Sequence, residues 1–359
     1  METTLHNSAA TAEAGPVRNL GHGEDFTAHM FSARWSEQHG WHDAGLRAIE
    51  YLSLHPATVG LHYGQVAFEG LKAHRQVDGK MGVFRPLWNA DRFRRSARRL
   101  AMPEIPEELF LRAVEELVVA DRSCLPEDLS RSLYLRPLLF ATDVSLMLRP
   151  AREYRFLLMA FVAGGFFGDD TESISVWVDD EYSRAFPGGT GDVKIAGNYA
   201  PTFVAQQRAQ QADCQQVLWL DAMEHRWLEE LGGMNVFLVR GRGADAEVIT
   251  PELTGTLLPG ATRDSILTLA SRLGYAPREE RISLNQLRTG CANGEISEMF
   301  ACGTAAVVTP VRRICEPGGQ FTVGDGPIGP VTRELCAALT GVQRGTVPDV
   351  DRWVYRIER

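Results

Sequence analysis

A lysine in a glycine-rich run is the first candidate for chemistry in this chain. Lys194 lies in Pro-Gly-Gly-Thr-Gly-Asp-Val-Lys-Ile-Ala-Gly-Asn-Tyr-Ala, residues 187–200. Only Lys72, Lys80 and Lys194 are lysines among the 37 Lys and Arg residues. Arginine stays protonated, whereas a lysine amine can lose its proton, attack a carbonyl group and form a Schiff base. The scarcity of lysine therefore indicates covalent chemistry, although a solvated loop lysine would fit the scarcity alone.

Two segments have the form of anion sites. In residues 258–267 a Pro-Gly turn leads into a helical pattern, which would place the N–H groups of Ala261 and Thr262 at a helix N-terminus. Free amides and the helix dipole favour an anion there. The Gly-Thr pair ending at Thr304 follows the apolar run 298–302 and could be a second cradle. Both patterns also occur as plain helix starts or turns.

Glu229 and Glu230 precede Gly-Gly-Met-Asn and a β-like run. A carboxylate here could hold a protonated ring nitrogen, because the glycines allow close approach. Without other evidence, a solvated acidic turn is the better interpretation. Residues 241–246 match the dinucleotide pattern G-x-G-x-x-A, but the strand-like run 247–250 follows at once and favours a hairpin turn. The phosphate-loop spacing G-x-x-x-x-G-K is absent around Lys194.

Composition narrows the function classes. The apolar content of 44% and charged content of 23% are ordinary for a globular protein, and the net charge of −9 gives no reason to expect nucleic acid or an anionic membrane as partner. There is no apolar run of the ~20 residues that span a bilayer, and the N-terminus lacks a secretory pattern, so we expect a cytoplasmic protein. Six scattered cysteines are expected as free thiols. His39 and His42 lack further ligands at metal-site spacing, so no metal is predicted.

Helical and strand-like patterns alternate along both halves of the chain. The predicted strands are 132–140, 154–162, 216–220, 234–239 and 247–250, and the predicted helices are 91–100, 106–120 and 261–273. A polar stretch at 168–173 is the best candidate for a domain boundary. This order favours two α/β domains with a ligand cleft between them.

Taken together, seven motifs resemble the branched-chain amino acid aminotransferases, the class IV, fold-type IV enzymes that use pyridoxal 5′-phosphate (PLP). The similarity runs from about residue 26 to the C-terminus. The motifs are 61–72, Phe-Arg-Pro at 84–86 followed by Asp91-Arg92, 132–137, 188–199, 229–235, 258–260 and 302–305.

The resemblance implies an α/β (α+β) fold of two domains in a homodimer. We expect a disordered N-terminus (1–20), a smaller N-terminal α/β domain (21–168), a linker (169–183) and a larger C-terminal PLP-binding domain (184–359) with a barrel-like β core. The substrates would be branched-chain L-amino acids and 2-oxo acids. Leu, Ile or Val would pass the amino group reversibly to 2-oxoglutarate, giving branched 2-oxo acids and L-glutamate.

The resemblance also assigns cofactor roles. Lys194 would bind PLP covalently and move the substrate proton, Glu230 would pair with the ring nitrogen, and Tyr199 would donate to the ring's phenolic oxygen. The remaining cofactor-binding residues would be Arg92, Ala261, Thr262 and Thr304 at the phosphate, Leu258 against the ring, and Asn235.

Substrate roles follow from the same motifs. Tyr63, Phe68 and Tyr134 would line the side-chain pocket, and Thr304 and Ala305 would offer amides to the α-carboxylate. Arg136 would bind the second carboxylate of glutamate or 2-oxoglutarate, with help from the Tyr63 hydroxyl. An arginine used only when that carboxylate is present lets one pocket accept apolar and acidic substrates.

Some positions depart from the family pattern. His22 stands where a pocket phenylalanine is usual, Met147 adds bulk to a loop that reaches the partner's pocket, and Ala306 and Thr309 replace a redox cysteine pair. One alternative is therefore the same chemistry on a bulkier or polar amino acid in a specialised pathway. The others are a D-amino-acid transaminase, an aminodeoxychorismate lyase, or a PLP-binding protein without catalytic activity.

Overall fold

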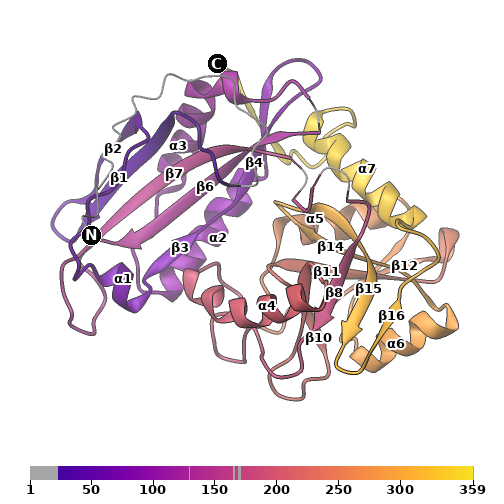
Figure 1. Cartoon of the computed structure of the whole chain (residues 1–359). Coiled ribbons are helices and arrows are strands. Elements are labelled where there is room, and N and C mark those ends of the chain that lie inside the picture. Colours follow the sequence, from indigo (N-terminus) through magenta and orange to yellow (C-terminus); the bar gives the residue numbers. More distant parts are fainter. Residues whose placement is uncertain (1–22, 129, 165, 169–170, 359) are drawn as a thin grey trace, which may run out of the picture.

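The structure is a computed structural model that describes residues 23–128, 130–164, 166–168 and 171–358. Its first and second halves lie side by side, each built on one β-sheet (Figure 1). The expected disorder of residues 1–20 and the departure at His22 lie outside the described residues.

The first half contains an antiparallel sheet in the strand order β17-β5-β4-β6-β7-β1-β2, with β3 also paired to β6. Its strands are β1 (His29–Ser36), β2 (Gly40–Ala48), β3 (Val66–Phe68), β4 (Leu71–Arg75), β5 (Met81–Phe84), β6 (Ser132–Ala141), β7 (Glu153–Ala163) and β17 (Val354–Ile357). Its helices are α1 (Val59–Tyr63), α2 (Pro86–Arg99) and α3 (Glu107–Ala120).

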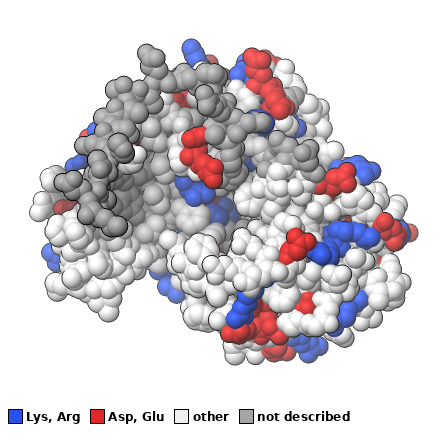
Figure 2. Space-filling model, viewed as in Figure 1, with Lys and Arg blue, Asp and Glu red and all other residues white. Residues whose placement is uncertain are grey.

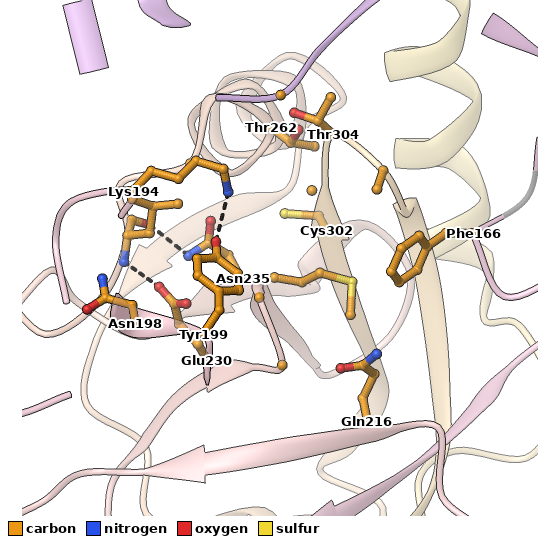
Figure 3. Close-up of a pocket in the computed structure, with 18 of the residues that line it drawn as sticks. Phe166, Lys194, Asn198, Tyr199, Gln216, Glu230, Asn235, Thr262, Cys302 and Thr304 are labelled. Atoms are coloured by element: carbon orange, nitrogen blue, oxygen red, sulfur yellow. Dashed lines mark hydrogen bonds between the residues drawn. The ribbon is translucent and has the colours of Figure 1, made fainter. Parts of the chain in front are cut away.

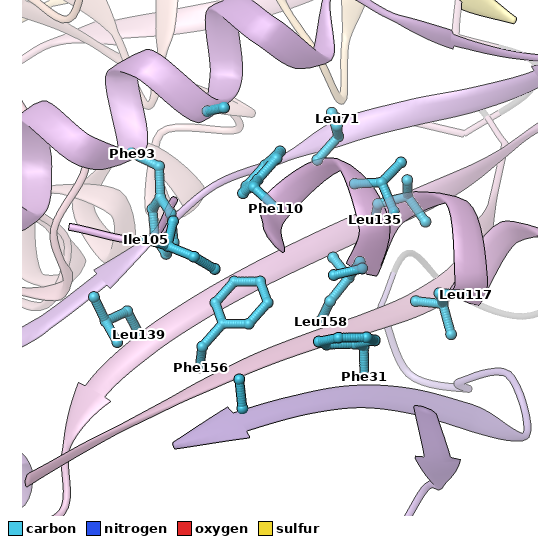
Figure 4. Packing of buried hydrophobic residues seen from close by; sticks show 14 of the residues in the cluster. Phe31, Leu71, Phe93, Ile105, Phe110, Leu117, Leu135, Leu139, Phe156 and Leu158 are labelled. Atoms are coloured by element: carbon cyan, nitrogen blue, oxygen red, sulfur yellow. The ribbon is translucent and has the colours of Figure 1, made fainter. Parts of the chain in front are cut away.

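Helices α2 and α3 cover one face of this sheet, because each carries an apolar stripe at helical spacing. Phe93 of α2 and Phe110 of α3 meet Phe156 of β7, with ring centroids 6.0 Å and 6.4 Å from that of Phe156 (Figure 4). Each fully buried phenylalanine contributes about 1.5–3 kcal/mol through loss of water contact. This core fixes α2, which carries a site residue, on the sheet.

The second half contains a closed six-stranded barrel. The neighbour order is β10-β9-β8-β15-β14-β11, and β11 pairs back to β10. Strands β12 and β13 extend the sheet from β11, and β16 pairs with β15. The strands are β8 (Ile174–Val178), β9 (Gln216–Leu220), β10 (Leu228–Leu231), β11 (Met234–Arg240), β12 (Glu247–Thr250), β13 (Ala276–Glu279), β14 (Ile296–Gly303), β15 (Val307–Glu316) and β16 (Gly319–Thr322).

Four helices accompany the barrel: α4 (Phe203–Gln211), α5 (Ala261–Arg272), α6 (Leu284–Asn293) and α7 (Pro330–Arg344). Leu269 of α5 and Leu335 of α7 pack in one cluster with Phe237 and Phe300 of the barrel. Phe84 of β5 belongs to the same cluster, so this core joins the two halves.

The mixed α/β architecture with a barrel-like core is confirmed, as are the predicted strands and helices. The hairpin turn at 241–246 is also confirmed, since β11 and β12 pair in antiparallel register. The division into domains stays a prediction. Strand β8 lies within the predicted linker yet belongs to the second sheet, and β17 returns the end of the chain to the first sheet.

Candidate active site

A cavity of about 380 Å³ opens between the two halves. Figure 2 shows a hollow in this region with Lys or Arg atoms at its floor. The first half contributes Phe68, Arg92, Tyr134 and Arg136, and the second half contributes Lys194, Asn198, Tyr199, Glu230, Asn235, Leu258, Ala261, Thr262, Thr304 and Ala305. The structure thus brings together every predicted site residue except Tyr63.

Lys194 presents its amine to the cavity beside a phenol. Its Nζ donates to the Tyr199 hydroxyl at 3.0 Å (Figure 3). The same atom lies 5.0 Å from the centroid of the Phe68 ring. The backbone is held on both sides, since Lys194 N donates to Ser96 Oγ at 2.9 Å and Phe68 N donates to the Lys194 carbonyl at 3.1 Å. The amine therefore lies beside a hydroxyl on a backbone that is held in place, which suits a nucleophile and proton carrier.

Glu230 is buried at the same cavity (Figure 3). Its Oε1 accepts from the Leu258 N–H, and its Oε2 lies 3.3 Å from Arg184 Nε. Burial raises the pKa of this carboxyl, and the charge of Arg184 opposes the rise. A ligand cation at the cavity would give the Glu230 carboxylate a further partner.

Glu229, the preceding acid, lies outside this cavity. Its Oε1 accepts from the Thr256 hydroxyl, and burial raises its pKa to about 7. Successive side chains of a strand point to opposite faces, so β10 can present only one of the two acids to the cavity. The interpretation of this segment as a solvated acidic turn is wrong: residues 228–231 form a buried strand.

The end of the cavity away from Glu230 has the features of an anion-binding site. Helix α5 begins at Ala261 without a side-chain N-cap, and Ala261 and Thr262 both line the cavity. A Cβ at Gly260 would lie 2.2 Å from Asn235 Oδ1, so the backbone approach needs glycine there. Asn235 Nδ2 in turn donates to the Leu258 carbonyl at 3.0 Å, which holds the segment before the helix.

Arg92 adds a cation to this end and is paired with Glu69. Arg92 Nε donates to Glu69 Oε1 at 2.7 Å, and Arg92 Nη2 donates to Glu69 Oε2 at 2.9 Å. Burial of Glu69 opposes its ionisation, but the Arg92 charge and hydrogen bonds outweigh burial and lower the pKa of Glu69. The pair thus stays ionised inside the protein, with Arg92 facing the cavity.

Aromatic and cationic groups form the other wall of the cavity. The Arg136 guanidinium carbon lies 5.0 Å from the Phe68 ring centroid and 5.5 Å from that of Tyr134. Tyr134 stacks on Phe161 at a centroid distance of 4.9 Å. Arg136 Nε has no hydrogen-bond partner among the described residues. This wall offers apolar ring faces together with a cation that can bind an acidic ligand.

Tyr63 lies elsewhere in its own chain. It is 44% exposed, and its hydroxyl donates to the Leu146 carbonyl at 2.7 Å. Leu146, Met147 and Leu148 are exposed as well, in the loop between β6 and β7. The prediction that Tyr63 lines the pocket is therefore not met within one chain.

Sequence reasoning missed several supporting residues. Glu69, Arg184 and Ser96 act through contacts distant in sequence, which leave no local signal. Asn198 could have been predicted from the sequence, because it follows the lysine in Gly-Asn-Tyr. Its side chain bonds to Thr190 and to the Val193 carbonyl and so ties the lysine loop together.

None of the helices in the described residues is long and apolar enough to cross a membrane. In the same part of the chain, no group of three or more His, Cys, Asp or Glu residues is placed to hold a metal ion.

Known proteins match most of this chain in sequence. The model of the amino-transferase class IV family matches residues 67–314. A branched-chain-amino-acid aminotransferase of Mycolicibacterium smegmatis is 47% identical over 342 residues, covering 95% of this chain and 93% of the relative.

Solved structures of similar proteins share the fold. The branched-chain amino acid aminotransferase of Escherichia coli superposes with a TM-score of 0.75 at 27% identity, over 91% of this chain and 99% of the other. The T.th. branched-chain amino acid aminotransferase complexed with N-(5′-phosphopyridoxyl)-L-glutamate gives a TM-score of 0.73 at 25% identity, over 91% and 98%. The family match over most of the chain decides its classification: this protein belongs to the class IV aminotransferases.

Proposed function

We propose that this protein is a PLP-dependent branched-chain-amino-acid transaminase, which moves the amino group of Leu, Ile or Val to 2-oxoglutarate and back. The carrying observation is one cavity that holds the Lys194 amine, the buried Glu230 carboxylate and the start of helix α5. Relatives with 47% and 41% identity over nearly the whole chain, from Mycolicibacterium smegmatis and Bacillus subtilis, are named for this activity.

The residues present fit PLP. The Glu230 carboxylate suits a protonated ring nitrogen, the Tyr199 hydroxyl suits the phenolic oxygen, and the amides of Ala261 and Thr262 suit the phosphate. Gly260 leaves the room at Asn235 that a Cβ would fill. When bound, PLP supplies an aldehyde that takes up the amino group and a ring that stabilises negative charge at the substrate Cα.

The chain's own residues direct that chemistry. Lys194 Nζ is the amine that can attack the aldehyde, and the same atom can accept the proton from the substrate Cα and return it. Glu230 would hold the ring nitrogen in its protonated form; burial raises the pKa of its carboxyl, and an adjacent cation opposes that rise. Arg184 provides that cation 3.3 Å away.

The aromatic and cationic wall of the cavity would suit both an apolar and an acidic substrate. Phe68 and Tyr134 offer ring faces to a branched aliphatic side chain, and Thr304 and Ala305 would bind the α-carboxylate through their amides. Arg136, whose Nε lacks a hydrogen-bond partner among the described residues, would bind the second carboxylate of 2-oxoglutarate.

We also propose a cytoplasmic homodimer. The exposed apolar residues Leu146, Met147 and Leu148 support a partner surface, and Tyr63, bonded to Leu146, would then serve the partner's cavity. The six cysteines are free thiols in the structure, which fits a reducing compartment. Sedimentation of wild type and Leu148→Asp tests the dimer. A monomeric wild type, or an unchanged dimer in the variant, would contradict this surface.

Borohydride reduction followed by peptide mapping tests the cofactor site. We expect a pyridoxyl group on Lys194 and no transamination by Lys194→Ala. Full turnover by that variant would remove Lys194 from the mechanism.

A single-turnover panel of amino donors, followed by the loss of PLP absorbance, tests the substrate class. We expect L-Leu, L-Ile and L-Val to react much faster than D-leucine or bulky polar amino acids. Reaction with a D-amino acid alone would favour a D-amino-acid transaminase, and reaction with none would favour a protein that only binds PLP.

A further inference from the structure

A second rare lysine lies behind the cavity, in a place that the proposed function leaves unexplained. Lys72 of β4 is only 5% exposed, and its Nζ donates to the Ala305 carbonyl at 3.1 Å. This contact crosses from the first sheet to the turn between β14 and β15 in the second. It is therefore a hydrogen bond between the two halves, directly behind the turn that lines the cavity.

The charge of Arg344 acts on Lys72, and the charge of Lys72 acts on His74. No carboxylate of the described residues forms an ion pair with it. His74 lies on the same face of β4, and neither of its ring nitrogens has a hydrogen-bond partner among the described residues. Burial together with the Lys72 and Arg344 charges lowers the pKa of His74 to about 3, so it is neutral. Arg344 of α7 adds a second positive charge, and burial together with that charge lowers the pKa of Lys72 to about 8.

A buried charge without a counter-ion is unfavourable and needs a reason. An anion bound on the far side of the turn would give the missing negative charge. The backbone is strained where the turn enters β15, because Val307, the first residue of that strand, has φ 57°, a left-handed conformation that β-branched residues rarely adopt. The Ala305 carbonyl and the Ala306 N–H belong to one planar peptide unit, so Lys72 holds the plane that directly follows the Ala305 residue in the turn.

Resting on the proposed function, we propose that Lys72 is a positioning residue for the substrate α-carboxylate: it holds the turn 303–306 through the Ala305 carbonyl and supplies the positive charge behind it. Lys72 does not itself line the cavity, so it acts through the turn. An amino donor and a 2-oxo acceptor share the α-carboxylate, so Lys72 serves both halves of the reaction. Arg136 would serve only the dicarboxylate.

The test uses 4-methylpentanoate, which is leucine without its amino group, and measures its binding by calorimetry to the enzyme in the pyridoxamine-phosphate form. At pH 7, Lys72→Met should weaken binding about 10-fold, the size of one lost charge-assisted contact. The KM for leucine should rise similarly while kcat changes less. Lys80→Met, the same substitution at an exposed lysine, should change neither.

The pH dependence of 4-methylpentanoate binding distinguishes the effect of the Lys72 charge from the effect of its packing. A lysine with a lowered pKa carries its charge below that pKa and loses it above, so wild-type affinity should fall as pH rises through about 8. Lys72→Met should lack this fall, and Lys72→Arg should bind ligand at pH 9.5 as at pH 7. If Lys72→Arg does not fold, the comparison of wild type with Lys72→Met still shows whether the charge of Lys72 causes the pH dependence of binding.

Two outcomes would overturn the inference. One is unchanged binding in Lys72→Met; the other is an equal loss at pH 7 and pH 9.5, which a purely structural role would give. In both cases wild type binds the probe, and the proposed function stands. No binding of 4-methylpentanoate to wild type would instead count against the proposed function.

Discussion

Replacing Glu69 by glutamine tests whether a buried carboxylate prepares Arg92 for the cofactor phosphate. Glu69 Oε1 accepts from Arg92 Nε at 2.7 Å, and Oε2 accepts from Arg92 Nη2 at 2.9 Å, from Asn89 Nδ2 at 2.9 Å and from the Gly70 N–H at 3.1 Å. A glutamine keeps the shape but turns an NH₂ donor toward these donors and removes the charge. Arg92, only 4% exposed, is then left without its counter-ion.

The expected magnitude depends on the cofactor. Removing one partner of a buried ion pair costs about 3–5 kcal/mol of unfolding free energy, so the PLP-free variant should lose an amount in this range. At roughly 2 °C per kcal/mol, its Tm should fall by about 6 °C or more. Saturating PLP should reduce the loss, because its phosphate restores a negative charge beside Arg92.

Glu104→Gln is the matched control. Glu104 binds Arg98, which like Arg92 belongs to α2, in the same two-pronged way, at 2.8 Å and 2.7 Å, but the Arg98 side chain is 65% exposed. Solvent screens that pair, so the Tm of Glu104→Gln should barely move. Equal shifts for the two variants, or a Glu69→Gln shift that PLP does not reduce, would refute the reasoning.

Lowering the pH should reduce the difference in stability between wild type and Glu69→Gln. The pKa of Glu69 is lowered, because the Arg92 charge and hydrogen bonds outweigh burial. Its stabilising contribution is thus present above the unfolded-state pKa, near 4.5, and is lost as pH falls through the folded-state pKa. The difference in stability between wild type and Glu69→Gln should therefore shrink below about pH 4.5.

Three further predictions concern the cavity. Arg136→Met should raise the KM for 2-oxoglutarate at least 10-fold more than the KM for leucine, the size of a lost charge-assisted hydrogen bond (~1.5–3 kcal/mol); equal losses in the two half-reactions would refute the assignment. Glu230→Gln should retain PLP but slow single-turnover transamination by roughly 10-fold or more, because a neutral amide no longer stabilises a protonated ring nitrogen; an unchanged rate would exclude that role. Gly260→Ala should weaken PLP binding in a fluorescence titration, since its Cβ would lie 2.2 Å from Asn235 Oδ1, whereas Gly45→Ala, with nothing within 4 Å, should not.

The sequence predicts much of the fold because its signals are local. Strands such as 247–250 and helices such as 261–273 follow from apolar periodicity within one segment. The cofactor end of the cavity was also predictable, since Lys194 and Tyr199 lie five residues apart in one motif. Their hydrogen bond at 3.0 Å joins two residues of this motif, although Ser96 and Phe68 of the first half hold the backbone of the lysine.

The features that the sequence does not predict depend on contacts between distant segments. Glu69 and Arg92 are 23 residues apart, and nothing in either segment shows that they pair. The resemblance points to Glu230 rather than Glu229, but the two residues alone do not show which of them faces the cavity, because the closed barrel decides which face of β10 meets it. The motif predicts that Tyr63 lines the pocket, but the structure places it outside the cavity of its own chain.

The distribution of basic residues connects these observations. Among the described residues, arginine or histidine is the basic partner in each ion pair, from exposed pairs such as Arg98 with Glu104 to the buried pair of Arg92 with Glu69. The two buried or half-buried lysines instead contact neutral groups, a phenol at Lys194 and a carbonyl at Lys72. A planar guanidinium fork suits a carboxylate, whereas a compact ammonium suits a single oxygen and can change its charge when buried. The rarity of lysine thus carries information because arginine already serves the ion pairs, and the lysines that remain inside the protein occupy positions where their particular chemistry is needed.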